Sequence, residues 1–294
     1  MTEVDSTTVE APAAAASGTL AIGGDLTVRR LGFGSMQLTG KGVWGEPADR
    51  GQAIAVLRRA VELGVDFIDT ADAYGPEVAE RLIAEALHPY QAGLVIATKV
   101  GFERPGPGVW VENGRPEHLR AACEGSLRRL RVDRIDLLQL HRIDSKVPVA
   151  DQIGALVELQ RAGKVRHIGL SEVKVAQIET VRRMTAVSSV QNKYNLVERG
   201  SGEVLDYCTR EGIAFIPWYP LDTGKLPKSG GPLGRAAKRL GATPAQVAIA
   251  WLLGKSPMML PIAGTSKLGH LEENVAAAAL RLDQATMETL EAMG

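Results

Sequence analysis

The stretch SLRRLRVDRIDLLQLH (residues 126–141) carries the pattern that decides the fold. Its first part continues an apolar helix face that begins upstream, because Leu119, Cys123, Leu127 and Leu130 recur at intervals of three and four residues. After a short polar break, IDLLQL is a continuous apolar run, as expected for a strand buried on both faces of a parallel sheet. The stretch therefore predicts a helix followed by a parallel strand that ends at a histidine.

Seven further apolar runs of similar length occur, with helix-like amphipathic stretches between them. Together with 135–141, the runs lie at residues 31–36, 65–70, 94–99, 165–171, 188–193, 213–218 and 258–264. Eight strand-then-helix units favour a closed parallel barrel over an open doubly wound sheet. We therefore predict an α/β protein with a (β/α)8 TIM barrel as its single domain over residues 19–294, with variable loops at 101–115 and 222–232.

Two N-terminal segments lie outside the eight units. TLAIGGDLTVRR (residues 19–30) reads as a short hairpin with Gly23 and Gly24 in its turn, placed to cap one end of the barrel. Residues 1–18 contain an alanine run, but their start is acidic and no apolar segment follows, unlike a targeting signal. We predict that residues 1–18 form a disordered tail.

Composition excludes several classes of function. The chain of 294 residues balances 34 Lys and Arg against 34 Asp and Glu, so no long-range field draws it to nucleic acid or an anionic membrane. No apolar run approaches the roughly 18 residues of a membrane span. Both cysteines, Cys123 and Cys208, fall inside expected helices, which argues against a disulfide framework. These features predict a cytoplasmic protein without nucleic-acid or membrane partners, and they leave its oligomeric state open.

Reactive side chains follow three consecutive predicted strands. Asp69, Lys99 and His141 end strands two, three and four, and Tyr74 lies five residues beyond Asp69. The carboxyl ends of barrel strands meet at the face that carries active sites. Asp69 and Lys99 alone could be a structural ion pair, and Tyr74 alone could be a rim residue. Their joint position with a histidine favours a catalytic site.

These four groups suit proton transfer to or from a carbonyl oxygen. A free phenol has a pKa of about 10, and a neighbouring ammonium favours the phenolate. We therefore expect Lys99 to lower the pKa of Tyr74, Asp69 to hold Lys99 charged, and His141 to donate a hydrogen bond to a substrate oxygen. The sequence shows neither a nucleophile–base motif nor metal-ligand spacing, so we predict no metal site. The remaining chemistry needs a source or sink of electrons.

A dinucleotide would have to bind without a Rossmann fingerprint. The glycines of Leu31-Gly32-Phe33-Gly34 lack the third glycine of that motif. By contrast, GTSK (residues 264–267) offers amides, hydroxyls and a cation at the start of an expected helix, where late barrel loops often bind phosphate. An ordinary capped turn is the alternative interpretation.

Several longer motifs resemble one family. They are DTADAYG (69–75), TKVG (98–101), SLRRLRVDRIDLLQLH (126–141), GKVRHIGLSE (163–172), VQNKYN (190–195), IPWYPL (216–221) and GTSKLGHLEEN (264–274). Together they resemble the aldo-keto reductase superfamily, and within it bacterial YdbC-type oxidoreductases, over about Val28 to Val275. The resemblance implies NAD(P)-dependent interconversion of carbonyls and alcohols on a (β/α)8 barrel.

Carried over by position, the resemblance implies a catalytic tetrad of Asp69, Tyr74, Lys99 and His141, with Tyr74 as the proton donor. It implies that Ser171 and Gln191 hold the nicotinamide carboxamide and that Trp218 stacks on the ring. All the cofactor contacts that it implies are Gly34, Met36, Ser171, Glu172, Gln191, Trp218, Pro220, Leu221, Thr223, Lys225, Gly264, Thr265, Ser266, Lys267, His270, Glu273 and Asn274.

Three positions depart from the family pattern. Glu172 replaces a common asparagine, His270 stands where many members carry an arginine for the 2′-phosphate, and Gly264 where many carry lysine. NADPH is the expected cofactor, with Lys267 compensating for these changes, and NADH is the alternative.

The scarce aromatic residues point to the same end of the barrel. Phe, Tyr and Trp make up only 4% of the chain. Seven of them fall in predicted loops or at strand ends around the mouth, namely Trp44, Tyr74, Phe102, Trp110, Tyr194, Trp218 and Tyr219. We expect Trp44 and Trp110 to wall the substrate pocket.

The sequence thus predicts an NADP-dependent oxidoreductase that reduces a small aldehyde or ketone. Three alternatives stay open: a dehydrogenase that oxidises a sugar or alcohol, a Schiff-base lyase that uses Lys99, and a barrel that senses nucleotide without turnover. Asp69 argues against the lyase because it would keep the Lys99 amine protonated.

Overall fold

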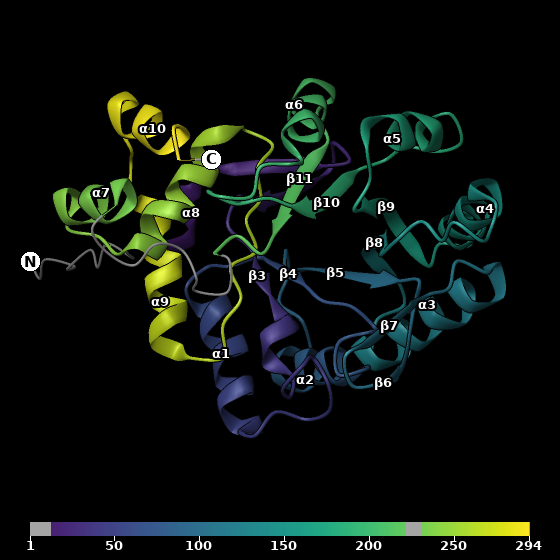
Figure 1. Ribbon diagram of the computed structural model, residues 1–294. Helices are drawn as coiled ribbons and strands as arrows, with labels where there is room; N and C mark the ends of the chain where they lie inside the picture. Colours follow the sequence, from purple (N-terminus) through teal and green to yellow (C-terminus); the bar gives the residue numbers. More distant parts are fainter. Residues whose placement is uncertain (1–12, 222–230, 294) are drawn as a thin grey trace, which may run out of the picture.

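The computed structural model describes residues 13–221 and 231–293, and its centre is a curled parallel sheet ringed by helices (Figure 1). The strands run in the order β11-β10-β9-β8-β5-β4-β3. Their bounds are β3 (Phe33–Gly34), β4 (Phe67–Asp69), β5 (Val95–Val100), β8 (Ile135–Leu140), β9 (Val165–Ser171), β10 (Ser189–Lys193) and β11 (Ala214–Trp218). The predicted strands along 31–218 are therefore confirmed, with the first one reduced to two residues.

Helices cover the outside of the sheet. They are α1 (Arg50–Glu62), α2 (Val78–Leu87), α3 (Pro116–Leu130), α4 (Val149–Arg161), α5 (Val175–Arg182), α6 (Gly202–Glu211), α7 (Pro232–Leu240), α8 (Pro244–Lys255), α9 (Leu268–Ala276) and α10 (Gln284–Glu291). Helix α8 begins as its sequence indicates, because the Thr243 hydroxyl accepts from the amide of Gln246 and Pro244 occupies the first turn. Within the described residues, no helix is long and apolar enough to cross a membrane.

The predicted eighth strand is wrong as a regular strand, yet its segment closes the barrel. On one side Phe215 N donates to Met258 O at 2.8 Å and Leu260 N donates to Phe215 O at 2.9 Å. On the other side Gly32 N donates to Pro261 O at 2.9 Å. Because Pro261 has no N–H, the segment cannot continue a ladder and makes isolated parallel bridges. The (β/α)8 barrel is thereby confirmed, with an irregular last member.

Two glycines permit this closure. A Cβ added to Gly264 would lie 2.2 Å from the carbonyl oxygen of Gly34, and a Cβ added to Gly34 would lie 2.9 Å from the carbonyl oxygen of Ile262. Both neighbours are backbone atoms, which cannot move aside as a flexible side chain does. The segments can therefore approach this closely only with glycine at both positions.

The N-terminal hairpin is confirmed. Strands β1 (Thr19–Ile22) and β2 (Leu26–Arg29) pair antiparallel around Gly23 and Gly24, both with positive φ. Its apolar side chains share one cluster with residues near the starts of the barrel strands; the cluster includes Leu20, Ile22, Leu26, Val28, Phe67, Val95 and Ala214. The hairpin therefore plugs the amino-terminal end of the barrel.

Two predictions about irregular segments are corrected. The disordered tail is wrong for residues 13–18, because Ala13–Ser17 form a 3-10 helix whose Ala14 N donates to Leu63 O at 3.0 Å. Residues 1–12 lie outside the described residues. The predicted loop at 101–115 contains a hairpin of β6 (Phe102–Gly106) and β7 (Val109–Glu112), and most of the loop at 222–232 is not described.

Replacing Gly264 by alanine should destabilise the fold. The new methyl group would push the eighth segment away from Gly34, and overpacking of this kind typically costs about 1–3 kcal/mol. Gly269→Ala is the matched control, because a Cβ there meets nothing within 4 Å and alanine favours the α9 helix. Urea unfolding of both variants without ligand checks this, and equal stabilities would contradict the account of the closure.

Candidate active site

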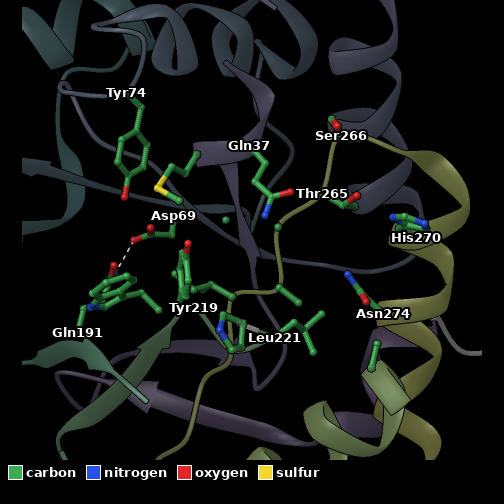
Figure 2. A pocket seen from close by; sticks show the side chains of 18 of the residues that line it. Gln37, Asp69, Tyr74, Gln191, Tyr219, Leu221, Thr265, Ser266, His270 and Asn274 are labelled. Atoms are coloured by element: carbon green, nitrogen blue, oxygen red, sulfur yellow. Dashed lines mark hydrogen bonds between the residues drawn. The ribbon is translucent and has the colours of Figure 1, made fainter. Parts of the chain in front are cut away.

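A pocket of about 900 Å³ opens at the carboxyl ends of the strands (Figure 2). One end holds reactive and aromatic groups, among them Asp69, Tyr74, Phe102, Trp110 and His141. The other end lies against the start of helix α9, where Thr265, Ser266, His270 and Asn274 line it. The site is therefore elongated, with chemically different ends.

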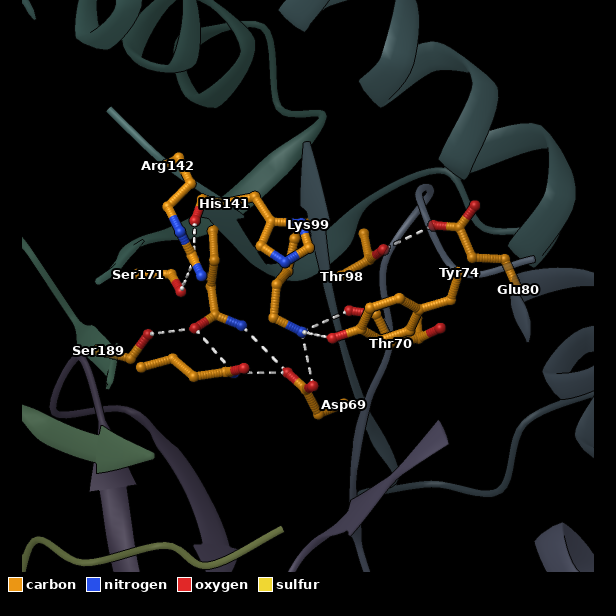
Figure 3. Close-up of polar contacts among 12 residues, drawn as sticks. Asp69, Thr70, Tyr74, Glu80, Thr98, Lys99, His141, Arg142, Ser171 and Ser189 are labelled. Atoms are coloured by element: carbon orange, nitrogen blue, oxygen red, sulfur yellow. Dashed lines mark hydrogen bonds and ion pairs between the residues drawn. The ribbon is translucent and has the colours of Figure 1, made fainter. Parts of the chain in front are cut away.

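A buried ion pair forms the floor of the reactive end (Figure 3). Lys99 Nζ donates to Asp69 Oδ1 at 2.6 Å and to Thr70 O at 2.8 Å, and the Lys99 side chain is fully buried. Burial acts to lower the pKa of Lys99, but Asp69 and Tyr74 outweigh it, so the net pKa is raised. Lys99 is thus a fixed ammonium below the pocket surface, which disfavours Schiff-base chemistry.

The second oxygen of Asp69 is held by two glutamines. Gln191 Nε2 donates to Asp69 Oδ2 at 2.8 Å, and Gln139 Nε2 donates to the same oxygen at 3.2 Å. Sequence reasoning missed Gln139, although it lies two residues before His141 and so faces the same side of β8. The carboxylate therefore has one preferred orientation.

Tyr74 lies beside this pair with its ring mostly buried. Lys99 Nζ donates to the Tyr74 hydroxyl at 3.3 Å and lies 5.0 Å from the ring centroid. The expected lowering of the Tyr74 pKa is wrong: burial raises this pKa, and the opposing effect of Lys99 is smaller. Near neutral pH Tyr74 is therefore a phenol with a proton to give.

His141 is surrounded by rings and cations. The ring centroid of Phe102 lies 4.7 Å away, that of Tyr74 6.0 Å and that of Trp110 6.2 Å. Burial lowers the pKa of His141 well below its usual value, and Lys99 and nearby arginines act in the same direction. Nδ1 has no hydrogen-bond partner among the described residues. Because the His141 ring also lines the pocket next to Tyr74, this neutral imidazole can bind a polar atom of a substrate there.

The far end of the pocket suits an anion. Lys267 is the N-cap residue of α9, and Thr265 Oγ1 accepts from Lys267 N at 3.1 Å. The first amides of a helix have no partner within it, so they and a lysine together favour a phosphate. The side chain of Glu273 accepts a hydrogen bond from the Thr243 hydroxyl at 2.5 Å, which ties α9 to the start of α8.

Most of the predicted contact residues line this one pocket. They are Gly34, Met36, Asp69, Tyr74, Trp110, His141, Ser171, Gln191, Trp218, Pro220, Leu221, Gly264, Thr265, Ser266, Lys267, His270, Glu273 and Asn274. Lys99 lies beneath it, as described above. Thr223 and Lys225 fall in 222–230, outside the described residues.

Glu172 does not line the pocket, in contrast to its prediction as a cofactor contact. Its carboxylate accepts from the Trp218 indole Nε1 and from Lys193 N, each at 2.6 Å. The backbone of Glu172 has φ +54°, in the left-handed region. These two hydrogen bonds direct the side chain toward the rim, where it orients the indole instead of meeting the pocket.

Two of the predicted mouth aromatics lie elsewhere. Trp44 does not line the pocket; the Arg104 guanidinium lies 5.5 Å from its ring and 3.6 Å from the Trp110 ring, so Trp44 sits in a second layer. Tyr194 is buried outside the sheet, stacked on Trp251 at 5.9 Å. The pocket lining that the sequence did not single out includes Gln37, Arg142, Thr243, Pro244, Ala245, Ile262 and Ala263.

Comparisons with known proteins agree on one family. The sequence model of the Aldo/keto reductase family matches residues 30–294. An uncharacterised oxidoreductase of Schizosaccharomyces pombe is 50% identical over 96% of this chain and 91% of its own length. Pyridoxine 4-dehydrogenase of Escherichia coli is 43% identical, over 91% of this chain and 96% of its own. A Klebsiella pneumoniae aldo/keto reductase, solved with NADP and acetate, superimposes with a TM-score of 0.79 at 25% identity, covering 93% and 94% of the two chains.

The lowered pKa of His141 predicts a pH-dependent stability. Below about pH 6.5 the unfolded histidine takes up a proton that the folded one does not, so the free energy of unfolding falls as the pH falls. The slope contributed by this group approaches about 1.4 kcal/mol per pH unit. Urea titrations between pH 7.5 and 5.5 should show a smaller decline for His141→Gln than for the unmodified protein.

His270→Gln is the control for this comparison, because His270 lies on the exposed side of the pocket rim. It should decline in parallel with the unmodified protein. If the free energy of unfolding of His141→Gln falls just as steeply with falling pH, the buried neutral state of His141 is contradicted.

Proposed function

This chain belongs to the aldo/keto reductase family, and we propose that it reduces aldehydes or ketones with NADPH, using Tyr74 as the proton donor. The observation that carries the proposal is the position of the Tyr74 hydroxyl, 3.3 Å from the buried Lys99 ammonium at the floor of the pocket. Burial raises the pKa of this phenol, so it keeps its proton near neutral pH. Such a phenol can release its proton to an oxygen and keep the resulting charge next to a cation.

The residues of the pocket fit a nicotinamide dinucleotide. At the reactive end, Trp218, Ser171 and Gln191 offer an indole, a hydroxyl and an amide to the nicotinamide. At the other end, the amides at the start of α9 and Lys267 offer a phosphate site. The Klebsiella pneumoniae relative was solved with NADP, which supports the same class of cofactor here. When bound, this cofactor supplies the hydride.

Side chains of the protein then bind the substrate oxygen and give it a proton. His141 and the Tyr74 hydroxyl hold it at the floor of the pocket, and Tyr74 passes its proton to this oxygen. Lys99 stabilises the phenolate that remains, and Asp69 keeps Lys99 charged and in place. Apolar walls from Phe102 and Trp110 exclude water from the reacting atoms.

The reverse reaction, oxidation of an alcohol, uses the same groups, with Tyr74 receiving the proton. The 43% identical relative from Escherichia coli is named pyridoxine 4-dehydrogenase, so pyridoxine and pyridoxal are the first pair to assay in both directions. The intact tetrad argues against a barrel that only senses nucleotide.

Tyr74→Phe should remove turnover but keep cofactor binding, because it deletes only the proton-donating hydroxyl. A loss of about 10²–10⁴-fold in kcat is expected from the lost acid. The affinity for NADPH, measured by the quenching of Trp218 fluorescence, should change little. Tyr90→Phe is the matched control, since the Tyr90 hydroxyl donates to Leu130 O at 2.7 Å away from the pocket. Unchanged turnover of Tyr74→Phe on a confirmed substrate would overturn the assigned role.

Cofactor preference should depend on Lys267. Lys267→Ala should weaken NADPH binding about tenfold, because one charge-assisted contact to phosphate is lost, and should weaken NADH binding less. Fluorescence titrations with both nucleotides measure this, and Lys238→Ala on the exposed side of α7 controls for net charge. Equal weakening of both nucleotides would place the 2′-phosphate elsewhere.

A further inference from the structure

We propose that Arg142 selects aromatic aldehydes that carry an anionic oxygen, and that it binds this oxygen while the carbonyl lies at Tyr74 and His141. The inference rests on the proposed reductase function and specifies its substrate class. Arg142 follows His141 directly (Figure 3). It lines the same pocket.

Arg142 has no carboxylate partner in the part of the chain that the structure describes. Its Nη1 donates to His141 O and to Ser171 Oγ, the latter at 3.1 Å. Two other shielded arginines do have carboxylate partners: Arg129 Nε lies 2.6 Å from a Glu80 oxygen, and Arg199 Nη1 lies 2.9 Å from a Glu291 oxygen. Among the described residues, Arg30, which does not line the pocket, donates only to backbone carbonyls. Arg142 is thus a half-buried cation with donors to spare, since a guanidinium carries five N–H groups.

The environment of Arg142 makes an anion favourable. Burial lowers the pKa of Arg142, and this effect outweighs the opposing fields of Glu172 and Glu112, so water solvates the guanidinium only in part. A planar anion such as a carboxylate can accept two parallel hydrogen bonds from a guanidinium. A negatively charged ligand oxygen next to the Arg142 guanidinium would therefore stabilise a charge that the protein itself solvates poorly.

The walls around Arg142 indicate an aromatic substrate. Its guanidinium carbon lies 5.7 Å from the centroid of the Phe102 ring. Phe102 and Trp110 meet edge to face with centroids 5.4 Å apart, and Tyr74 meets Trp110 in the same way at 6.5 Å. Flat rings at these angles leave surfaces against which another ring can pack. Cation and aromatic wall together fit a ring that bears both an aldehyde and an ionised oxygen.

The anionic oxygen could be a ring carboxylate or a phenolate, and the substrates of the test separate them. The NADPH-loaded protein is assayed with 3-nitrobenzaldehyde as the neutral reference, with 2- and 3-carboxybenzaldehyde, and with 2-hydroxybenzaldehyde above and below its phenol pKa. We expect kcat/KM for at least one anionic form to exceed the reference by tenfold or more. In Arg142→Met this ratio should fall at least tenfold, and Arg142→Lys should restore part of it.

A purely positioning role through Ser171 would give another result. Loss of the hydrogen bond to Ser171 would lower kcat/KM for neutral and anionic aldehydes by the same factor, and the ratio would stay constant. A constant ratio overturns the proposal. Arg120→Met, which removes an exposed arginine of α3, controls for net charge and should leave the ratio unchanged.

Binding separates this proposal from failure of the proposed function. Benzoate and benzamide are titrated into the NADPH-loaded protein, and no turnover is needed. Benzoate should bind at least tenfold more tightly than benzamide, and Arg142→Met should abolish the difference. If no aldehyde is reduced but the binding of benzoate still depends on Arg142, the proposed reductase function is wrong and the proposed anion site is supported. Equal binding of both compounds to the unmodified protein overturns the site itself.

Discussion

The ion pair between Lys99 and Asp69 is the constraint around which the site is organised. Two charges removed from water are tolerated only when they meet each other and further hydrogen-bond partners. Pairing of β4 with β5 sets Asp69 beside Ala97, which brings the Lys99 ammonium within 2.6 Å of the carboxylate. Tyr74 and the two glutamines complete the shell. Any change that moves these strands would expose or separate the charges, so barrel geometry and proton chemistry are linked.

The same pair supports the proposed role of Tyr74 as an acid. Burial alone would hold the proton on Tyr74 firmly, as the raised pKa indicates. The ammonium at 3.3 Å reduces the cost of losing it at the moment when a substrate oxygen accepts it. His141, neutral for similar reasons, adds a polar contact without adding a competing charge.

Periodicity predicted the barrel, and the positions of Asp69, Lys99 and His141 at strand ends predicted the reactive end of the site, because both depend on local sequence order. Most of the other residues of the pocket were predicted only through the resemblance to a family. The irregular eighth strand could have been foreseen, because Pro261 lies in the middle of its apolar run and has no N–H to donate to a ladder. The sign of the Tyr74 pKa shift depended on burial, which composition does not reveal. Glu172 and Arg142 show the same limit, since the direction of the Glu172 side chain and the identity of the hydrogen-bond partners of Arg142 are properties of the tertiary structure.

The hairpin at the amino-terminal end of the barrel decides from which side ligands can reach the pocket. Its packed side chains close that end of the barrel. The pocket opens at the opposite end, where the carboxyl ends of the strands lie. The cofactor, the substrate and the product of the proposed reaction would therefore enter and leave through the same opening.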